Sequence, residues 1–314
     1  MTTKFPEIKT AQEFIFHFKD KFWLEAAALI CRRHKIVFQV LRRSEHGENV
    51  VFLVDDSFVI KIFTPFRNGF ERESEALALA RGKTSLPVPE IFFAGEIENF
   101  KYFVTTQFSG DSITRDVWLA LKKKDQTKIL SQLANGLKEL HSHAAPTKNF
   151  DWRKFVEYQA NTTIERQKSS GANAEWLANL PEFLNTNLKL LPLDSAPSFM
   201  HGDVHFGNLR LAKKDGRLQI SGLFDFADSL SGFYEYEFVA VGVLMIQGQG
   251  ELQREFFRAY GYKEEELNEN LRARLMLLTI LYECSSLRKY ALRLKPEAID
   301  FTLAELERAI WNFV

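Results

Sequence analysis

The 314-residue sequence contains only two cysteines, Cys31 and Cys284, and they lie far apart in the chain. Thiols so few and so widely separated exclude a secreted scaffold held by disulfides, and they lack the spacing of a cysteine-based metal site. The N-terminal residues show no apolar segment after a basic start, so no secretory signal is expected. The sequence therefore predicts a cytoplasmic protein with two reduced thiols.

Long apolar runs and an excess of one charge are also missing. The longest apolar run, ARLMLLTILY, is too short to cross a bilayer and indicates a buried helix. Lysine and arginine together number 41, and so do aspartate and glutamate. This balance argues against a general binder of nucleic acid or of anionic membranes, and we expect neither partner.

What the sequence does contain is a β-rich first third followed by a helical remainder. Runs of β-branched and aromatic residues predict strands over residues 35–43, 49–56, 57–63, 86–97 and 101–108, and helical patterns cover 11–30 and 70–82. Helical periodicity then covers 125–143, 151–167, 175–191, 251–260 and 269–292, interrupted by one hairpin with Asp215-Gly216 at its turn. The expected fold is α+β: a small β-rich lobe over residues 1–107 and a larger, mainly helical lobe over residues 108–314.

One lysine lies in a strand whose two faces are otherwise apolar. In SFVIKIF, alternation places Lys61 between apolar neighbours, so its ammonium group needs a counter-charge or an anionic ligand. Glu73 falls on the inward stripe of the next helix, and a Lys61–Glu73 pair across the lobe is the simplest prediction. The alternative is an edge-strand lysine that reaches out to water. Kinases use such a pair to hold a lysine against nucleotide phosphates.

A glycine-rich loop, which would strengthen that interpretation, is absent. The upstream turn SEHGENVV contains a single glycine, Gly47. This turn could cover the phosphates of a nucleotide, but its composition is more often that of a plain hairpin turn.

Several polar side chains gather in the stretch SFMHGDVHFGNLRLAKKDGRLQISGLFDFAD, residues 198–228. Asp203 and Asn208 are five residues apart, and the hairpin returns Asp225 to the same place. Phosphoryl transfer from ATP requires such a set, because one carboxylate orients the attacking hydroxyl while oxygen ligands hold magnesium ions. Two histidines, His201 and His205, also lie here. Zinc binding is their alternative role, but no cysteine partner accompanies them, and packing of the loop by hydrogen bonds is the simpler prediction.

This pattern resembles the aminoglycoside phosphotransferase/choline kinase-like family, whose hallmark is H-G-D-x-H-x-x-N followed by an Asp-aromatic pair. The protein-kinase pattern has the same interval from aspartate to asparagine, but here Gly202 replaces its arginine and Ala227 replaces the glycine of D-F-G. VIKIF, ERE, LPVPEIFF, FVTTQFSG, LKELHSH and GFYEYEFV follow in the family's order. The resemblance covers residues 47 to 239, and the last seventy or so residues match only as generic helices.

The resemblance implies a protein-kinase-like two-lobe fold and an ATP-dependent, magnesium-dependent transfer to a small-molecule hydroxyl. It implies that Asp203 is the catalytic base and that Asn208 and Asp225 are magnesium ligands. Lys61, held by Glu73, would contact the α- and β-phosphates of ATP. The backbone of Thr106, Gln107 and Phe108 would face the adenine, and Gly47 would lie in the loop over the phosphates.

The acceptor is left open by the sequence. Members of this family phosphorylate aminoglycosides, choline, homoserine, methylthioribose, sugars and macrolides. Candidate substrate contacts are Asp228, His205 and Glu283, which lies within an almost wholly apolar predicted helix. A buried carboxylate hydrogen-bonded inside the lobe is the alternative for Glu283. Between Asp228 and Glu283 there are ten acidic and five basic residues, a mild indication of a cationic acceptor such as an aminoglycoside.

Two rival functions are weighed against this prediction. A protein kinase is disfavoured by Gly202 and by the lack of a recognisable activation segment after Asp225. A non-catalytic pseudokinase is disfavoured because all five of the residues named for catalysis and nucleotide binding in kinases are present. The protein is expected to be a monomer or a homodimer.

Overall fold

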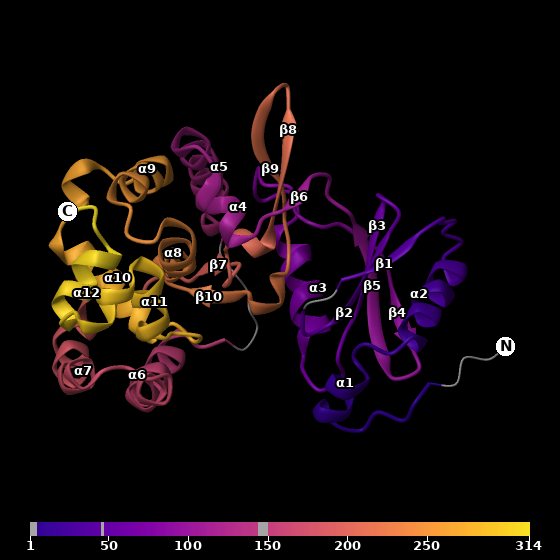
Figure 1. The fold of residues 1–314 in the computed structure, drawn as a ribbon, viewed down its shortest axis with the longest axis horizontal. Helices are drawn as coiled ribbons and strands as arrows, with labels where there is room; N and C mark the ends of the chain where they lie inside the picture. Colours follow the sequence, from indigo (N-terminus) through magenta and orange to yellow (C-terminus); the bar gives the residue numbers. More distant parts are fainter. Residues whose placement is uncertain (1–4, 45–46, 144–149) are drawn as a thin grey trace.

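The computed structural model describes residues 5–44, 47–143 and 150–314, and it places a β-sheet with flanking helices beside a helical assembly (Figure 1). The strands are β1 (Leu41–Arg43), β2 (Val50–Val54), β3 (Phe58–Ile62), β4 (Ile91–Ile97), β5 (Phe100–Thr106), β6 (Asp111–Ser112), β7 (Ser198–Met200), β8 (Leu209–Lys214), β9 (Arg217–Leu223) and β10 (Leu230–Gly232). The α-helices are α1 (Ala11–His17), α2 (Phe22–Arg33), α3 (Gly69–Ala80), α4 (Arg115–Ala120), α5 (Lys123–His141), α6 (Trp152–Ser169), α7 (Ala174–Asn187), α8 (Phe238–Ala240), α9 (Gly250–Tyr260), α10 (Glu269–Leu281), α11 (Leu287–Leu294) and α12 (Leu303–Ile310).

The larger sheet has five antiparallel strands in the order β1-β2-β3-β5-β4. Alternation sends Ile60 and Ile62 of β3 into a core that α1 and α2 cover, and both side chains are fully buried. Lys61 points to the opposite face, where α3 packs. The sheet therefore has one face sealed by the first two helices and one face that presents Lys61.

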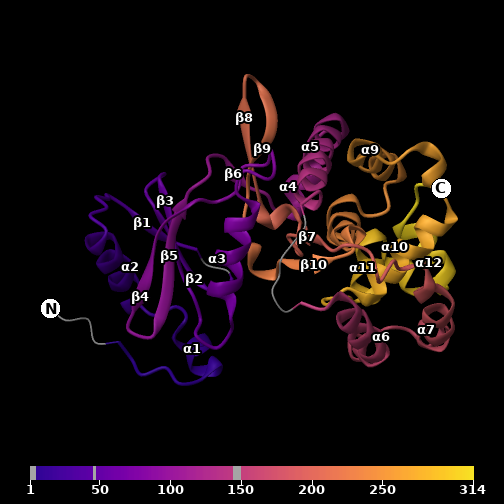
Figure 2. The ribbon, with the colours of Figure 1, turned by 180° about the vertical axis from the view of Figure 1, so that it is seen from behind.

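A second and larger core joins α3 to the helical part of the molecule. It includes Phe63, Leu77 and Phe103 from the sheet region and runs through the buried faces of α5, α9 and α10. The helical part also holds the short pair β7–β10 and the three-stranded sheet β6-β8-β9. Seen from both sides, the β8–β9 hairpin stands between the two parts (Figures 1 and 2).

The hairpin turn has the predicted chemistry. Asp215 and Gly216 both have positive φ, 51° and 72°, which is the conformation that a tight two-residue hairpin requires. The hairpin brings Asp225, which follows β9, back to Asn208, which precedes β8: the Phe224 N–H donates to the Asn208 carbonyl at 3.1 Å. The residues of this turn therefore determine that Asp225 and Asn208 lie close together.

The prediction of one continuous helix over residues 11–30 is wrong, because a turn separates α1 from α2. The Asp20 N–H donates to the His17 carbonyl, and the Asp20 carboxylate lies 2.7 Å from His17 Nδ1. These local bonds close a turn that ends the first helix. Trp23 fixes the turn by donating from its indole to the same His17 carbonyl at 3.0 Å.

Two predicted strands are shorter than expected. Of residues 35–43 only β1 is a strand. The Val40 carbonyl still accepts from the Asp55 N–H, but the Gln39 and Val40 N–H groups donate to the Asp55 carboxylate instead of to a neighbouring strand. Of residues 86–97 only β4 is a strand, since Pro87 and Pro89 cannot donate to a ladder. In both segments the backbone N–H groups needed for strand pairing are either taken by a side chain or absent.

The predicted long helix over residues 269–292 is also broken, into α10 and α11, with an irregular segment at residues 282–286. The backbone groups of the break find tertiary partners: the Glu283 N–H donates to Tyr236 Oη at 3.0 Å, and the Leu287 N–H donates to Gln167 Oε1 at 2.9 Å. Ser286 caps the new helix by accepting from the Lys289 N–H.

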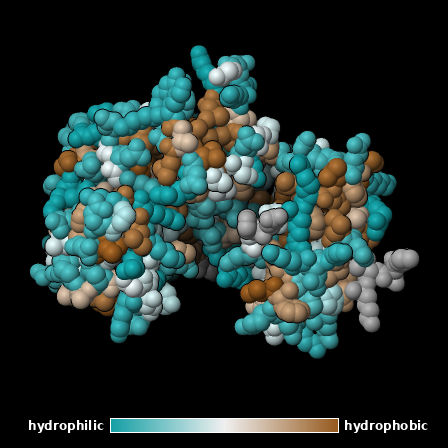
Figure 3. All heavy atoms as spheres, viewed as in Figure 1, coloured by the Kyte–Doolittle hydropathy of each residue, from teal (hydrophilic) through white to brown (hydrophobic). Residues whose placement is uncertain are grey.

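The surface is hollowed between the sheet part and the helical part (Figure 3). Among the helices of the described residues, none combines the length and the apolar character that crossing a bilayer requires.

Candidate active site

The loop from His201 to Asn208 begins where β7 ends, and its path depends on a glycine. Gly202 has φ +89°, and a Cβ atom there would lie 2.1 Å from the carbonyl oxygen of Asp228. Any other residue would be strained and would push residue 228 away. The β7–β10 pair, in which Met200 faces Leu230, holds the same two segments together.

Asp203 is held in this loop by three side chains. Asn208 Nδ2 donates to the Asp203 carbonyl at 2.9 Å and to its Oδ2 at 3.2 Å, and His205 Nε2 lies 3.3 Å from Oδ2. The Tyr282 hydroxyl donates to the Gly202 carbonyl at 2.9 Å and lies 3.4 Å from Asp203 Oδ1. Partial burial alone would raise the pKa of Asp203, but the contacts with His205 and Asn208 and the nearby His201 outweigh it and lower that pKa. The carboxylate is therefore ionised at neutral pH.

The two histidines of the loop have structural hydrogen bonds. His201 Nδ1 accepts from the Asp203 N–H at 3.2 Å, so its Nε2 carries the proton that is donated to the Phe224 carbonyl at 3.0 Å. His205 Nδ1 accepts from the Gly207 N–H at 2.9 Å, which leaves its Nε2–H directed at Asp203. These bonds match the predicted role in packing the loop. Within the described residues no cluster of three or more His, Cys, Asp or Glu is placed so that it could hold a metal ion on its own.

A buried carboxylate fastens the start of the loop. Glu237 accepts from the backbone N–H of His201 at 2.6 Å and from that of Gly202 at 2.9 Å, and His141 Nε2 lies 3.5 Å from it. Glu237 is 1% exposed, so these bonds replace its hydration. A structural role, in which Glu237 anchors the backbone of the loop, fits this position.

Lys61 makes the predicted pair with Glu73 and a second pair that reaches the helical part. Its Nζ lies 2.5 Å from Glu73 Oε2 and 2.7 Å from Asp225 Oδ1. The side chains of Lys61 and Glu73 are 12% and 4% exposed, so the alternative of a lysine reaching out to water is wrong. Burial alone would lower the pKa of Lys61, but the carboxylates of Glu73 and Asp225 outweigh it and raise that pKa.

Asn208 and Asp225 supply oxygen atoms of the kind that Mg²⁺ prefers. Both amide hydrogens of Asn208 serve Asp203, which leaves Oδ1 as the atom available to a cation. The side chain of Asp225 is 46% exposed although it contacts Lys61. Mg²⁺ commonly binds one or two protein oxygens and fills its other positions with phosphates and water. This donor set fits such an ion.

The linker between the sheet and the helical part presents polar groups without protein partners. The N–H groups of Thr106 and Gln107 donate to the carbonyls of Glu90 and Ser57. Within the described residues the Phe108 N–H makes no hydrogen bond, and Gln107 Oε1 is buried without a partner. One free donor and one free acceptor suit the edge of a purine base.

The last predicted nucleotide contact, Gly47, lies in the turn between β1 and β2. Its φ is +124°, a conformation that favours glycine. The two residues before it lie outside the described parts of the chain, and the Ser44 N–H donates to the Val51 carbonyl at the base of the turn. A position over the phosphates remains a prediction.

Glu283 differs from expectation. It lies exposed in the break between α10 and α11, so both its predicted helical position and the alternative of a buried carboxylate are wrong. Asp228 is exposed as well, and its pKa is raised by partial desolvation and by the charges of Asp203, Asp225 and Glu283. Asp203, Asp225, Asp228 and Glu283 therefore lie near one another, and the surface around these four carboxylates is called the opening below. Arg72 is the basic side chain that lowers the pKa of Asp228.

Most other acidic residues between positions 228 and 283 do not face this opening. Glu235 receives two hydrogen bonds from Arg274, both at 2.6 Å, and Glu264 pairs with Arg254 and Arg258. The excess of acidic residues in that segment is therefore largely used within the helical part. Asp228 and Glu283 are the exposed residues of this segment whose negative charge lies at the site.

The sequence interpretation missed Tyr282 and Arg72. Tyr282 stands in an apolar run where an aromatic residue indicates packing, and only the break of the helix turns its hydroxyl to Asp203. Arg72 precedes Glu73 and donates to the Ser229 carbonyl at 3.4 Å, from the sheet part to the helical part. Its position next to Glu73, which faces inward, is the sequence signal that could have indicated a role for Arg72.

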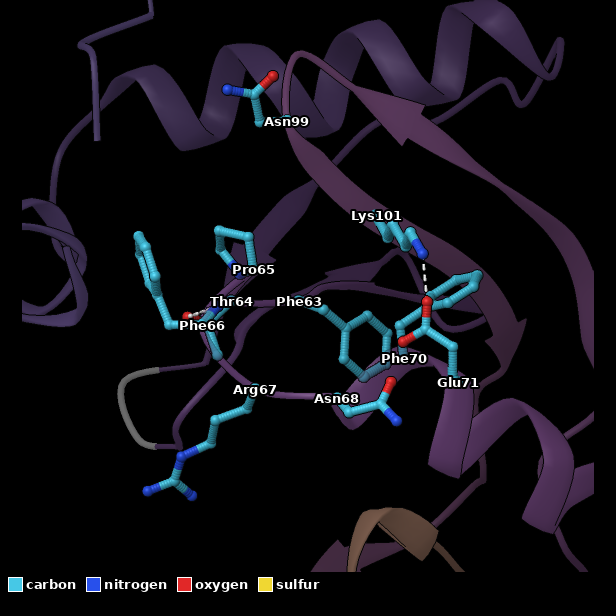
Figure 4. Close-up of a pocket in the computed structure, with 10 residues that line it drawn as sticks. All are labelled: Phe63, Thr64, Pro65, Phe66, Arg67, Asn68, Phe70, Glu71, Asn99 and Lys101. Atoms are coloured by element: carbon cyan, nitrogen blue, oxygen red, sulfur yellow. Dashed lines mark hydrogen bonds and ion pairs between the residues drawn. The ribbon is translucent and has the colours of Figure 1, made fainter. Parts of the chain in front are cut away.

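A separate hollow of about 400 Å³ lies beside the loop between β3 and α3 (Figure 4). Its walls include Pro65, Asn68 and Asn99, and Lys101 and Glu71 point toward each other across it as an ion pair. None of the residues predicted for catalysis or nucleotide binding lines it. The two basic residues of its lining are both paired, Lys101 with Glu71 and Arg67 with Glu48, so the hollow lacks the free charge of a phosphate site.

Comparisons with known proteins agree with this geometry. The sequence model of the phosphotransferase enzyme family matches residues 40–276. A comparison with curated protein sequences finds no match. Similar solved structures include the GDP complex of wild-type aminoglycoside 2'-phosphotransferase-IIIa, with 16% identity, 93% of this chain and 99% of that chain covered and a TM-score of 0.66.

Two further structures show the same fold. The streptomycin–ATP ternary complex of APH(2")-IIa has 18% identity over 90% of this chain and 97% of that chain, with a TM-score of 0.58. APH(4)-Ia has 16% identity over 91% and 99%, with a TM-score of 0.61. The predicted α+β, protein-kinase-like fold is confirmed. Because its family model spans most of the sequence, this chain belongs to the phosphotransferase enzyme family and is a small-molecule kinase.

Proposed function

We propose that the chain transfers the γ-phosphoryl group of ATP to a hydroxyl group of a small molecule, with Mg²⁺ as the cofactor. The observation that carries the proposal is the convergence of an ionised Asp203 with Asp225, which Lys61 contacts from the opposite part of the molecule. The charges of both aspartates act on Asp228, so they lie around one opening. A base and a phosphate-binding lysine facing each other are the parts that phosphoryl transfer requires.

Asp203 is the proposed catalytic base. The acceptor hydroxyl donates a hydrogen bond to its carboxylate, which aligns the hydroxyl oxygen with the γ-phosphorus. As the new O–P bond forms and the bond to ADP breaks, the hydroxyl proton passes to Asp203. The contacts from Asn208, His205 and Tyr282 fix the carboxylate before the acceptor arrives.

The nucleotide is proposed to bind between residues 1–107 and residues 108–314, which we take as two lobes. Lys61 would contact the α- and β-phosphates, and Glu73 would hold its ammonium group in place. Thr106, Gln107 and Phe108 would face the base, where Phe108 offers a free N–H, and Gly47 would lie over the phosphates. Complexes of similar structures with ATP, ADP and GDP support a purine nucleotide in this fold.

Asn208 and Asp225 are the proposed magnesium ligands. When bound, Mg²⁺ would neutralise charge on the phosphate oxygens. The chain's own contribution is to hold two oxygen donors at the ends of one hairpin, with the Phe224 N–H bonded to the Asn208 carbonyl between them.

The acceptor is proposed to be cationic, with aminoglycosides as the first candidates. Asp228 and Glu283 place exposed negative charge at the opening, and His205 lies against Asp203 where an acceptor would approach. Similar structures include complexes with streptomycin, gentamicin and kanamycin. Choline, homoserine, sugars and macrolides are the alternative acceptors.

The test is a screen of the purified protein for ADP and GDP release with aminoglycosides, macrolides, amino alcohols and sugars. We expect acceptor-dependent release with at least one cationic compound, dependent on added Mg²⁺ and absent in Asp203→Asn. Release that depends only on neutral acceptors would contradict the cationic acceptor. Phosphorylation of proteins alone, with no small molecule accepted, would support a protein kinase instead.

A further inference from the structure

Arg210 is a half-buried cation that has no acidic partner at contact distance. It lies in β8, two residues after Asn208, and within the described residues its guanidinium group makes no ion pair and donates no hydrogen bond. It lies against an aromatic ring: the guanidinium carbon is 4.9 Å from the centroid of Phe224. A partly desolvated guanidinium of this kind has unused capacity to bind a ligand.

The strand register shows which face Arg210 occupies. Its neighbours Leu209 and Leu211 are 0% and 6% exposed and point into the helical core, so Arg210 points to the opposite face. Directly across in β9 is Gly222, and a Cβ atom there would lie 2.1 Å from the Phe108 ring. The Phe108 ring therefore covers Gly222 on the same face as Arg210.

This face lies between the two ends of the proposed nucleotide site. At one end Phe224 directly precedes Asp225, whose carboxylate contacts Lys61. At the other end Phe108 belongs to the linker, where the N–H group is free. A nucleotide with phosphates at Lys61 and a base at the linker would pass over Arg210. In Figures 1 and 2 the hairpin that carries Arg210 stands at the junction of the two parts.

We propose that the guanidinium group of Arg210, supported from behind by the Phe224 ring, is the platform on which the purine base stacks. The inference rests on the proposed function and assigns a base-binding residue within that site. An arginine that stacks on one aromatic ring offers its second planar face to another, and nucleobases stack on guanidinium planes as they do on aromatic rings. The base, rather than the phosphates, is the partner because Lys61 already serves the phosphate end.

The experiment measures binding by titration calorimetry for the wild type, Arg210→Ala, Arg210→Lys and the control Lys213→Met. Lys213 is an exposed residue of the same strand, so its substitution removes an equal charge away from the site. The ligands are ATP, GTP and inorganic tripolyphosphate, each with Mg²⁺. Thermal unfolding of each variant shows whether it is folded.

Arg210→Ala is expected to weaken binding of ATP and GTP by about 3- to 30-fold, the range of a cation–π contact, and to leave tripolyphosphate binding unchanged. Arg210→Lys, which keeps the charge but loses the plane, should show a smaller loss for the nucleotides, and Lys213→Met none. Equal losses for nucleotides and tripolyphosphate would overturn the proposal in favour of a phosphate contact. Unchanged nucleotide affinity in Arg210→Ala would overturn it while leaving the proposed function intact. A wild type that binds no purine nucleotide would overturn both.

Discussion

The sheet side and the helical side of the site hold charged groups in different ways. On the sheet side, Lys61 and Glu73 are buried and stabilise each other as an ion pair. On the helical side, Asp203 contacts no lysine or arginine of the described residues and is held by an amide, an imidazole and a phenol. The lysine needs strong pairing because it is buried in an apolar surrounding, whereas the aspartate, as the proposed base, would need an oxygen that is free for the acceptor. Burial, and not charge alone, therefore decides which partners a site residue requires.

The largest effect is expected from Asp203→Asn, which removes the group on the helical side that acts on the acceptor. An amide cannot accept the hydroxyl proton, so kcat should fall by about 10² to 10⁴. Nucleotide affinity should remain near that of the wild type, because Lys61 and the linker are untouched. Steady-state ADP release with an acceptor from the screen and calorimetry with ATP check the two parts, and retained turnover would contradict the assignment.

Next is Lys61→Met, which breaks the buried pair of the sheet side. Glu73, 4% exposed, would lose its partner, and the free energy of unfolding should fall by about 3 kcal/mol in denaturant titrations. The matched control is Lys101→Met, since Lys101 pairs with Glu71 on the same lobe but both are roughly half exposed. That variant should lose at most about 1 kcal/mol. Equal losses in the two variants would show that burial does not distinguish the pairs.

A smaller effect is expected from Tyr282→Phe, which removes one neutral donor from the helical side. The Gly202 carbonyl would lose its 2.9 Å bond, and Asp203 would be less well fixed. A loss of about 1 kcal/mol corresponds to a fall in kcat of about fivefold with KM nearly unchanged. Because a donor near the carboxylate favours its ionised form, the acid limb of the kcat profile should move to higher pH. A purely structural role would lower stability without moving that limb.

The smallest effect is expected from Asp228→Asn at the rim. The pKa of Asp228 is raised in the folded protein, so ionising this residue above that pKa costs folding free energy. The amide should raise Tm by about 1 to 2 °C at pH 7.5, since the site is exposed and the charges are screened. The gain should shrink as the pH falls towards the folded-state pKa and vanish below about pH 4, where the unfolded chain is protonated too. A gain that is independent of pH would contradict this origin.

The sequence was sufficient where the pattern is local. Alternation in β3 predicted that Lys61 faces inward, the helical stripe predicted that Glu73 meets it, and Asp215-Gly216 predicted the turn that returns Asp225 to Asn208. In each case the relevant residues are close in sequence or belong to adjacent elements. The roles assigned to these residues remain predictions.

The sequence was not sufficient where distant groups decide the backbone path. The apolar run through α10 carries no stop signal, and the break after Leu281 exists because Gln167 and Tyr236 bond its backbone. Tyr282 and Glu283 were therefore misplaced together. The predicted strand over residues 35–43 is shortened for the same reason, since the Asp55 side chain takes the N–H groups of Gln39 and Val40 that a strand would use. Periodicity describes a segment by itself and contains no information on such partners.

The close packing of Gly202 against the Asp228 carbonyl has a consequence for motion. Together with the β7–β10 pair and the bond from Phe224 to Asn208, it joins the segments that carry Asp203 and Asp225 into one body. Rocking of the sheet part against the helical part would then leave the spacing of these two aspartates constant. The ion pair from Lys61 to Asp225 and the bond from Arg72 to the Ser229 carbonyl are contacts that would stretch, so opening for nucleotide exchange would loosen the phosphate end while the acceptor end keeps its shape.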